Sequence, residues 1–302
     1  MTAMISSGPL TSGRATATGL LAILLWSAVI GLIRSVSESF GPTGGAALIY
    51  STACGLLLLT TRPPKLLDFP RRYLAWGGLL FVTYEICLAL SIGHAGSSRQ
   101  AIEVSMVNYL WPTFTMLAAI LFNGQRAGPL ILPGAAISLA GVLWVLGGDQ
   151  GLDPAALAAN VRSNPLSYAL ALAAAVLWSV FSVVTARISG GKNATIVFFA
   201  LTAAVLWIKY AAMGGGSMAF TPRSAGTLLL AAAAMGFGYV AWNIGILHGN
   251  MVMLAGASYF TPILSVALSA LVLSTPLALS FWQGAAMVCA GSMLCWMATR
   301  GR

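Results

Sequence analysis

Long apolar runs, separated by short stretches of Gly, Pro and charged residues, dominate the hydrophobic pattern of this chain. A helix needs roughly 20 mostly apolar residues to cross about 30 Å of hydrocarbon. The pattern therefore predicts an all-α membrane protein with ten transmembrane helices, over residues 17–34, 44–61, 73–92, 101–122, 129–147, 166–187, 194–213, 226–246, 251–273 and 279–298.

The two hydrophobic halves of the chain resemble each other in sequence, which indicates an internal repeat. An offset of 150 residues pairs Asn-Tyr-Leu-Trp-Pro at 108–112 with Ser-Tyr-Phe-Thr-Pro at 258–262, and Gly-Ala-Ala at 134–136 with 284–286. Five spans per half is an odd number, so the second copy must enter the membrane with opposite topology. We predict a first five-helix repeat over 17–147, a linker over 148–165 and a second repeat over 166–298. Such duplication is typical of secondary transporters, which bind substrate where the halves meet around a central cavity.

Composition supports a lipid environment, because 59% of the residues are hydrophobic and 7% are charged, against about 25% charged in soluble proteins. The net charge of +9 comes from basic residues that lie singly in short loops, which indicates membrane topology and not nucleic-acid binding. With the N-terminus inside, the inner side carries Arg14, Arg62, Lys65, Arg71, Arg72, Arg126, Arg187, Lys192, Arg300 and Arg302, and the outer side carries Arg34, Arg99, Arg162 and Arg223. Both termini are therefore predicted to be cytoplasmic.

A tyrosine lies three residues before a proline in both copies of the repeated segment. Each tyrosine is roughly 12 Å deep, and the two approach the midplane from opposite faces. Each proline frees a backbone carbonyl one turn earlier, which lipid tolerates where the kink lines protein or a wet cavity. A plain packing kink is the alternative. The candidate residues are Asn108, Tyr109 and hinge Pro112 in the first half, and Ser258, Tyr259 and hinge Pro262 in the second.

Glu85 is the one ionisable side chain well inside a predicted span. Such a residue is costly in a membrane and by default faces the bundle interior. It is a candidate partner for a substrate ammonium or a proton site, and a structural carboxyl bonded to a neighbouring helix is an equally open reading. Glu103 lies near the outer end of its span, where we expect water.

Several aromatic side chains lie within spans and are candidate walls of a pocket, with Asn243 as a polar neighbour: Tyr84, Trp111, Trp178, Tyr239 and Trp242. We interpret Trp26 as core packing. Other aromatics fit interfacial belts: Tyr50, Trp76, Tyr168, Trp207, Tyr210 and Trp296. His94 and His248 end two corresponding spans and are candidates for gating or pH sensing, with a structural role as the alternative.

Motifs of several protein classes are missing from the sequence. It has no Walker P-loop, no HExxH, no GxSxG, no Rossmann glycine set before a helix and no TVGYG-like filter. We therefore expect neither an enzyme nor an ion channel, and no cofactor. The cysteines Cys54, Cys87, Cys289 and Cys295 lack metal-site spacing and are expected to be small buried hydrophobes.

The ten spans in two halves, with Trp-Ser in spans one and six and Tyr-x-x-Pro in spans four and nine, resemble the drug/metabolite transporter superfamily with two EamA-type repeats. The segments 93–98 and 108–112 look like its YddG branch of bacterial aromatic amino acid exporters. The resemblance covers residues 17–298. It implies an inner-membrane protein with a basket-like bundle, a central cavity, alternating access and outward movement of amino acids or similar metabolites. It carries over no single invariant catalytic residue.

The leading hypothesis is an exporter of aromatic and other amino acids with broad specificity, working by alternating access. The pocket rings would hold the side chain, Glu85 or the ring faces the ammonium, and Asn108, Asn243 or freed backbone donors the carboxylate. One alternative is an exporter of lipophilic drugs or toxic cations by proton exchange at Glu85. Another is a structural or lipid-handling membrane protein without flux. The expected partners are a small-molecule substrate and membrane lipid, with no nucleic acid and no obligate protein partner.

Overall fold

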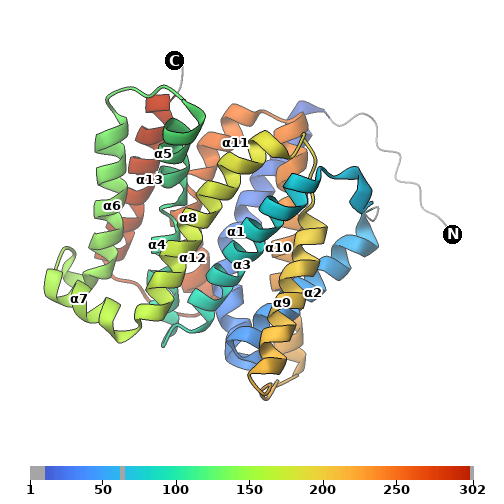
Figure 1. The fold of residues 1–302 in the computed structure, drawn as a ribbon. Helices are drawn as coiled ribbons and strands as arrows, with labels where there is room; N and C mark the ends of the chain where they lie inside the picture. Colours follow the sequence, from blue (N-terminus) through green and yellow to red (C-terminus); the bar gives the residue numbers. More distant parts are fainter. Residues whose placement is uncertain (1–10, 62–64, 300–302) are drawn as a thin grey trace.

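The computed structural model describes residues 11–61 and 65–299, and the regular elements within them are helices (Figure 1). The first half contains α1 (Ser12–Phe40), α2 (Pro42–Thr60), η1 (Leu66–Asp68), the π-helical turn η2 (Tyr73–Gly77), α3 (Gly78–Gly93), α4 (Ser98–Asn108), α5 (Trp111–Asn123) and α6 (Ile131–Leu146). The second half contains η3 (Gly148–Gln150), α7 (Pro154–Ser163), α8 (Pro165–Ile188), α9 (Thr195–Ala212), α10 (Pro222–His248), α11 (Met251–Ser258), α12 (Thr261–Val272) and α13 (Leu279–Thr299).

Polar caps and prolines set the starts of several helices. The Asp153 side chain accepts from the first backbone N–H groups of α7, and Asn164 does the same for α8. Thr221 and Ser224 form a capping box at α10. Each of these helices begins with a proline, which costs nothing there because the first N–H groups have no partner within the helix.

Eight helical segments of the described residues are long and apolar enough to cross a membrane. They match eight of the ten predicted spans and confirm a multi-pass helical membrane protein. The other two predicted spans fall on shorter apolar helices, α6 with 16 residues and the interrupted pair α11 and α12. The linker also holds α7, which the apolar pattern did not predict because none of its ten residues is buried.

The two helix breaks lie at matching positions of the two halves. In the first, α4 ends at Asn108 and α5 begins at Trp111; in the second, α11 ends at Ser258 and α12 begins at Thr261. A proline is the second residue of both α5 and α12, and it cannot donate to the carbonyl one turn before it. The Thr261 hydroxyl donates to the freed Ser258 carbonyl over 2.6 Å, so side-chain chemistry satisfies one of the freed oxygens.

Helix packing is reciprocal between the halves. The first long helix of each half packs against the same two elements of the other half. Thus α1 packs along α10 and against α12, and α8 packs along α3 and against α5. Further extensive contacts join α2 to α9, α2 to α10 and α6 to α13, and Figure 1 shows α6 and α13 side by side at one end of the bundle. These pairs of corresponding helices therefore make corresponding contacts, whereas the contact between α1 and α2 has no equally extensive equivalent between α8 and α9.

Glycines bring α6 and α13 into backbone contact. A Cβ atom added at Gly141 would lie 2.7 Å from the carbonyl oxygen of Gly284, and one added at Gly284 would lie 2.7 Å from that of Gly141. Gly134 and Gly291 face each other in the same way. No larger residue allows this approach, so these glycines set how closely the two helices pack.

Candidate functional site

Glu85 lies in the middle of α3 with 1% of its surface exposed. Tyr50 of α2 donates its hydroxyl to Oε2 over 2.7 Å, and Tyr239 of α10 donates to Oε1 over 2.8 Å. None of the ion pairs among the described residues includes this carboxyl. Two phenols, one from each half of the chain, therefore satisfy an acid that has no basic partner.

Aromatic rings surround this carboxyl. The ring centroid of Tyr239 lies 5.1 Å from that of Trp26, 5.5 Å from Phe199 and 5.6 Å from Phe81. Trp26 in turn lies 5.5 Å from Trp242. These distances are within the range of favourable aromatic pairs, so a continuous aromatic cluster encloses one side of the acid.

A second group of rings joins the first through Trp178 of α8. Its centroid lies 4.7 Å from Tyr84, 6.2 Å from Trp111 and 6.3 Å from Tyr239. Phe181 stands one turn away at 5.3 Å. The structure thus brings together the five predicted aromatic residues of the pocket, Tyr84, Trp111, Trp178, Tyr239 and Trp242.

Asn108 supplies a polar group at the edge of this cluster. It is 4% exposed, its side chain lies beside the phenol of Tyr84, and its Oδ1 has no hydrogen-bond partner among the described residues. A buried acceptor without a donor costs about 1–3 kcal/mol, so a ligand that donates there would recover free energy. Asn243 of α10 is half-buried and makes no side-chain hydrogen bond within the described part of the chain.

The tyrosines at the helix breaks lie elsewhere. Tyr109 is buried beside Ser265 of α12, and the ring of Tyr259 lies 5.8 Å from that of Trp296 of α13. The Ser258 hydroxyl donates to a carbonyl of its own helix over 2.8 Å. None of these three side chains bonds to Glu85 in the described residues, whereas Asn108 and Trp111 of the same repeated segment lie in the cluster.

The two histidines lie at helix ends. Nδ1 of His94 is 2.9 Å from the carbonyl oxygen of Leu90, and the His94 carbonyl accepts from Asn164 over 2.9 Å. His248 is the last residue of α10 and is exposed. His94 thus has a structural bond to its own helix.

Two expectations about Tyr50 and Tyr168 were wrong. Neither belongs to an interfacial belt: Tyr50 is fully buried against Glu85, and Tyr168 is 5% exposed with its hydroxyl 3.4 Å from Oε2 of Glu103. The position of Tyr50 along its helix could have indicated burial. Tyr50 lies eight residues into α2, which places it roughly 12 Å from the end of the helix and too deep for an interfacial residue. Trp26 is a further member of the cluster that was interpreted as packing alone.

A polar cleft of about 290 Å³ lies at the start of α4. Arg99 reaches Glu103 over 3.0 Å and also pairs with Asp149 of η3. Glu103 is 4% exposed, so the expectation of a wet side chain was wrong. The Arg99 guanidinium lowers the pKa of Asp149, which lies outside the membrane helices. One guanidinium thus holds two carboxyl groups, and the network ties α4 to η3.

Metal binding has no obvious site in the described residues. They contain no group of three or more His, Cys, Asp or Glu side chains able to hold an ion. The four cysteines are buried on membrane helices, and none of them forms a disulfide. The groups that the cluster around Glu85 presents are aromatic faces, phenols, the Asn108 amide and one carboxyl.

Known proteins resemble this chain along nearly its whole length, although no family model matches it. An aromatic amino acid exporter YddG of Salmonella typhimurium is 54% identical over 293 residues, which are 97% of this chain and 100% of that protein. Its namesake in Escherichia coli is 53% identical over 291 residues, 96% and 99% of the two chains. A probable terminal-alkyne amino-acid exporter of Streptantibioticus cattleyicolor is 25% identical over 93% of each chain.

A solved crystal structure shares the fold. It aligns with a TM-score of 0.65 over 95% of this chain and 97% of its own, at 23% sequence identity. The identities above 50%, over almost complete chains, show the family directly. The chain belongs to the YddG family of aromatic amino acid exporters, within the drug/metabolite transporter superfamily.

Proposed function

We propose that this protein exports amino acids, aromatic ones among them, across the bacterial inner membrane. The named activity of its relatives supports the substrate class. The observation that carries the proposal within this chain is the pairing of Glu85 with Tyr50 and Tyr239 inside a cluster of aromatic rings. A zwitterion with an aromatic side chain needs an acidic partner, apolar rings and a polar group, and all three meet there.

The ten-span inverted repeat is the architecture we propose for this function. The reciprocal helix contacts support it, because a two-fold relation between halves converts the α1–α10 contact into α8–α3 and the α1–α12 contact into α8–α5. The matched helix breaks also support it. α6 extends for roughly 24 Å and α11 with α12 for roughly 33 Å at 1.5 Å per residue, lengths that suit a short and a discontinuous span.

The substrate would lie among the rings of Tyr84, Trp178 and Tyr239. Its ammonium would approach Glu85 or the negative face of an indole, and the Nδ2 group of Asn108 or Asn243 would donate to its carboxylate. Few buried polar groups surround the rings. A substrate with a different side chain would therefore leave few protein groups without a hydrogen-bond partner, and we expect broad specificity.

Alternating access would move one repeat against the other. The breaks before Pro112 and Pro262 are the places where a helix half can change direction, since the intrahelical ladder is already interrupted there. The distribution of Lys and Arg favours cytoplasmic termini. Substrate would then enter from the side of α11 and leave past α7.

The decisive experiment is uptake of labelled phenylalanine and threonine into proteoliposomes, with and without an imposed pH gradient. We expect flux of both for the wild type. Glu85→Gln should lower phenylalanine flux about ten-fold, since a hydrogen bond to a charged group contributes about 1.5–3 kcal/mol. Glu38→Gln is the matched control, because Glu38 pairs with Arg34 at the exposed end of α1. No amino acid flux under any gradient would refute the export proposal.

A drug or cation exporter is the second candidate, and the lack of a basic partner for Glu85 among the described residues favours it. An acid free of a fixed cation can exchange a proton for a cationic ligand. In that case Glu85→Gln abolishes cation flux, whereas it only weakens the flux of a neutral amino acid. Comparing the two fluxes in one preparation separates these functions.

A further inference from the structure

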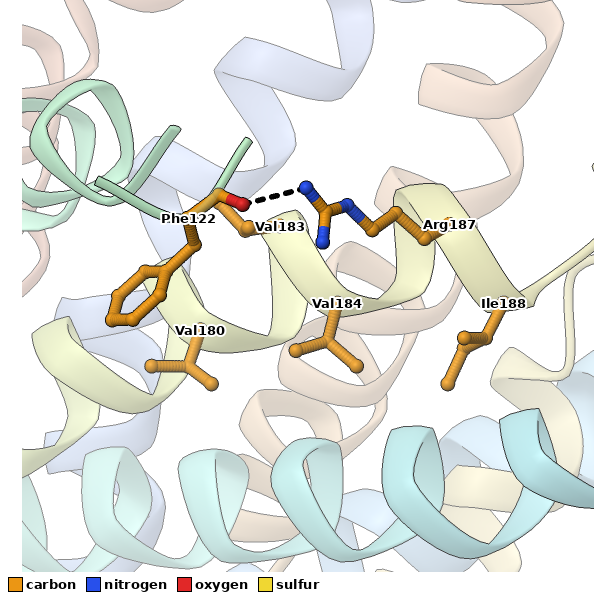
Figure 2. Close-up of a pocket in the computed structure, with 6 residues that line it drawn as sticks. All are labelled: Phe122, Val180, Val183, Val184, Arg187 and Ile188. Carbon is orange, nitrogen blue, oxygen red and sulfur yellow. Dashed lines mark hydrogen bonds between the residues drawn. The ribbon is translucent and has the colours of Figure 1, made fainter. Parts of the chain in front are cut away.

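An apolar groove of about 350 Å³ lies between the C-terminal ends of α5 and α8. Phe122 and three valines, Val180, Val183 and Val184, line it together with Ile188 and Arg187. Figure 2 shows Val180, Val184 and Ile188 projecting from the same side of α8, while Arg187 extends along the helix to the end of α5. The groove is thus hydrocarbon with a single cation.

Arg187 is placed to receive an anion. One of its terminal nitrogens donates to the carbonyl oxygen of Phe122 over 2.6 Å (Figure 2). A guanidinium has five N–H donors in a rigid fork, so this bond orients the group and leaves donors for a second acceptor. The side chain is exposed, and in the described residues no carboxylate pairs with it.

Apolar exposure continues from the groove along α8. Val176 and Leu172, one and two turns further from Arg187 than Val180, are 46% and 45% exposed. From Val176 to Arg187 the helix rises roughly 16 Å. A strip of exposed hydrocarbon that ends at a cation matches the shape of an acyl chain below its headgroup.

The chemistry of the groove favours a phospholipid over the transported amino acid. An amino acid would bring an ammonium as well as a carboxylate, and the Phe122 carbonyl at the mouth already accepts from Arg187. An anionic phospholipid brings a phosphate and long hydrocarbon and needs no acceptor. A guanidinium binds phosphate oxygens in a bidentate manner.

We propose that this groove is a binding site for one anionic phospholipid, with its phosphate on Arg187 and an acyl chain against Val180, Val184 and Ile188. With the orientation proposed above, the site faces the inner leaflet, where basic side chains near the surface attract anionic lipids. The lipid would connect α8 to the C-terminal end of α5, the helix that begins at the Pro112 break.

Native mass spectrometry of the purified chain tests this site without reference to transport. The protein in detergent is titrated with dioleoyl-phosphatidylglycerol or, separately, dioleoyl-phosphatidylcholine. The wild type should retain phosphatidylglycerol in preference. Arg187→Gln should reduce that preference about five-fold, the equivalent of about 1 kcal/mol for one basic side chain at an anionic surface. Val184→Phe, which fills the groove without changing charge, should reduce retention of the same lipid.

Arg14→Gln is the matched control, since Arg14 is an exposed arginine on the same predicted side in α1 and lies outside the groove. It should leave the preference unchanged. The proposal is overturned if Arg187→Gln and Arg14→Gln lower retention equally, which would indicate non-specific attraction. It is also overturned if phenylalanine displaces phosphatidylglycerol at concentrations that saturate export, because the groove would then belong to the substrate.

Discussion

Tyr239 donates its phenolic hydrogen to Oε1 of Glu85 over 2.8 Å, and this bond joins α10 of the second half to α3 of the first. Any motion that separates these helices must break it or carry it along. A bound ammonium would compete with the phenol for the same oxygen. In the substrate site proposed above, the pair would couple occupancy of the site to contact between the halves.

Removing either phenol should destabilise the protein. Tyr50→Phe and Tyr239→Phe each leave one buried carboxyl oxygen short of a donor, at a cost of about 1–3 kcal/mol. We expect both variants to unfold at lower temperature in a detergent thermal-shift assay. Tyr210→Phe is the control, because its hydroxyl bonds an exposed turn at Gly216. Equal unfolding temperatures for all three variants would contradict this assignment.

Selectivity for aromatic substrates should depend on Trp178. Trp178→Ala removes its ring contacts with Tyr84 and Trp111, each pair contributing about 0.5–1.5 kcal/mol. Phenylalanine flux should fall about three- to ten-fold relative to threonine flux in the same liposomes. Trp76→Ala, at a residue 59% exposed, should leave the ratio of the two fluxes unchanged. A parallel loss of both substrates would remove Trp178 from the specificity pocket.

Closing a helix break should slow transport without loss of stability. Pro262→Ala supplies an N–H group that can donate to the Ser258 carbonyl and extend α11 into α12, and proline costs about 3 kcal/mol in a helix interior. Initial rates of uptake should fall while the unfolding temperature stays the same or rises. Pro154→Ala, at the first turn of α7, is the matched control. Wild-type rates in Pro262→Ala would mean that the break is not a hinge.

The contact between α6 and α13 should tolerate no side chain at its centre. Gly141→Ala would put a Cβ atom 2.7 Å from the Gly284 carbonyl oxygen, so the helices must separate and the unfolding temperature should fall. Gly226→Ala is the matched control, because nothing lies within 4 Å of an added Cβ there. That change should stabilise α10 by about 0.5–1 kcal/mol. The opposite order of unfolding temperatures would rule out the close approach.

The ion pair at the linker should make stability depend on acid pH. Because Arg99 lowers the pKa of Asp149 in the folded protein, ionised Asp149 favours folding above its ordinary pKa. This contribution is lost as pH falls through the lowered pKa. Thermal stability measured between pH 7 and pH 3 should therefore show Asp149→Asn below the wild type at neutral pH and the two converging at the acid end. A constant difference would assign the effect to another contact.

The helical membrane class followed directly from the apolar runs, because lipid requires every backbone group to be satisfied within the segment. The same reasoning brought Tyr84, Glu85 and Tyr239 together, since an intramembrane carboxyl must face polar groups of the interior. Eight spans correspond to candidate helices. The prediction failed where a helix has no apolar run, as in α7.

The sequence indicated that Glu85 faces the interior of the bundle, but it did not identify the side chains that bond to it. Tyr239 was predicted as an aromatic wall of the pocket, and its hydrogen bond to Glu85 was not. Tyr50 was missed because one tyrosine on a uniformly apolar helix shows no periodicity that reveals the direction it faces. The burial of Glu103 was missed because it depends on Tyr168 of α8, which packing brings beside it from another helix. Arg99 lies one turn before Glu103 on α4 itself, so their pairing follows from sequence spacing.

The glycine contact between α6 and α13 is isologous: Gly134 meets Gly291, Gly141 meets Gly284, and each of these contacts is the image of the other under the 150-residue offset. One surface is therefore complementary to itself. A larger side chain on α6 at this contact would therefore need an equal volume removed from the facing position on α13, so the residues at these positions must change in pairs.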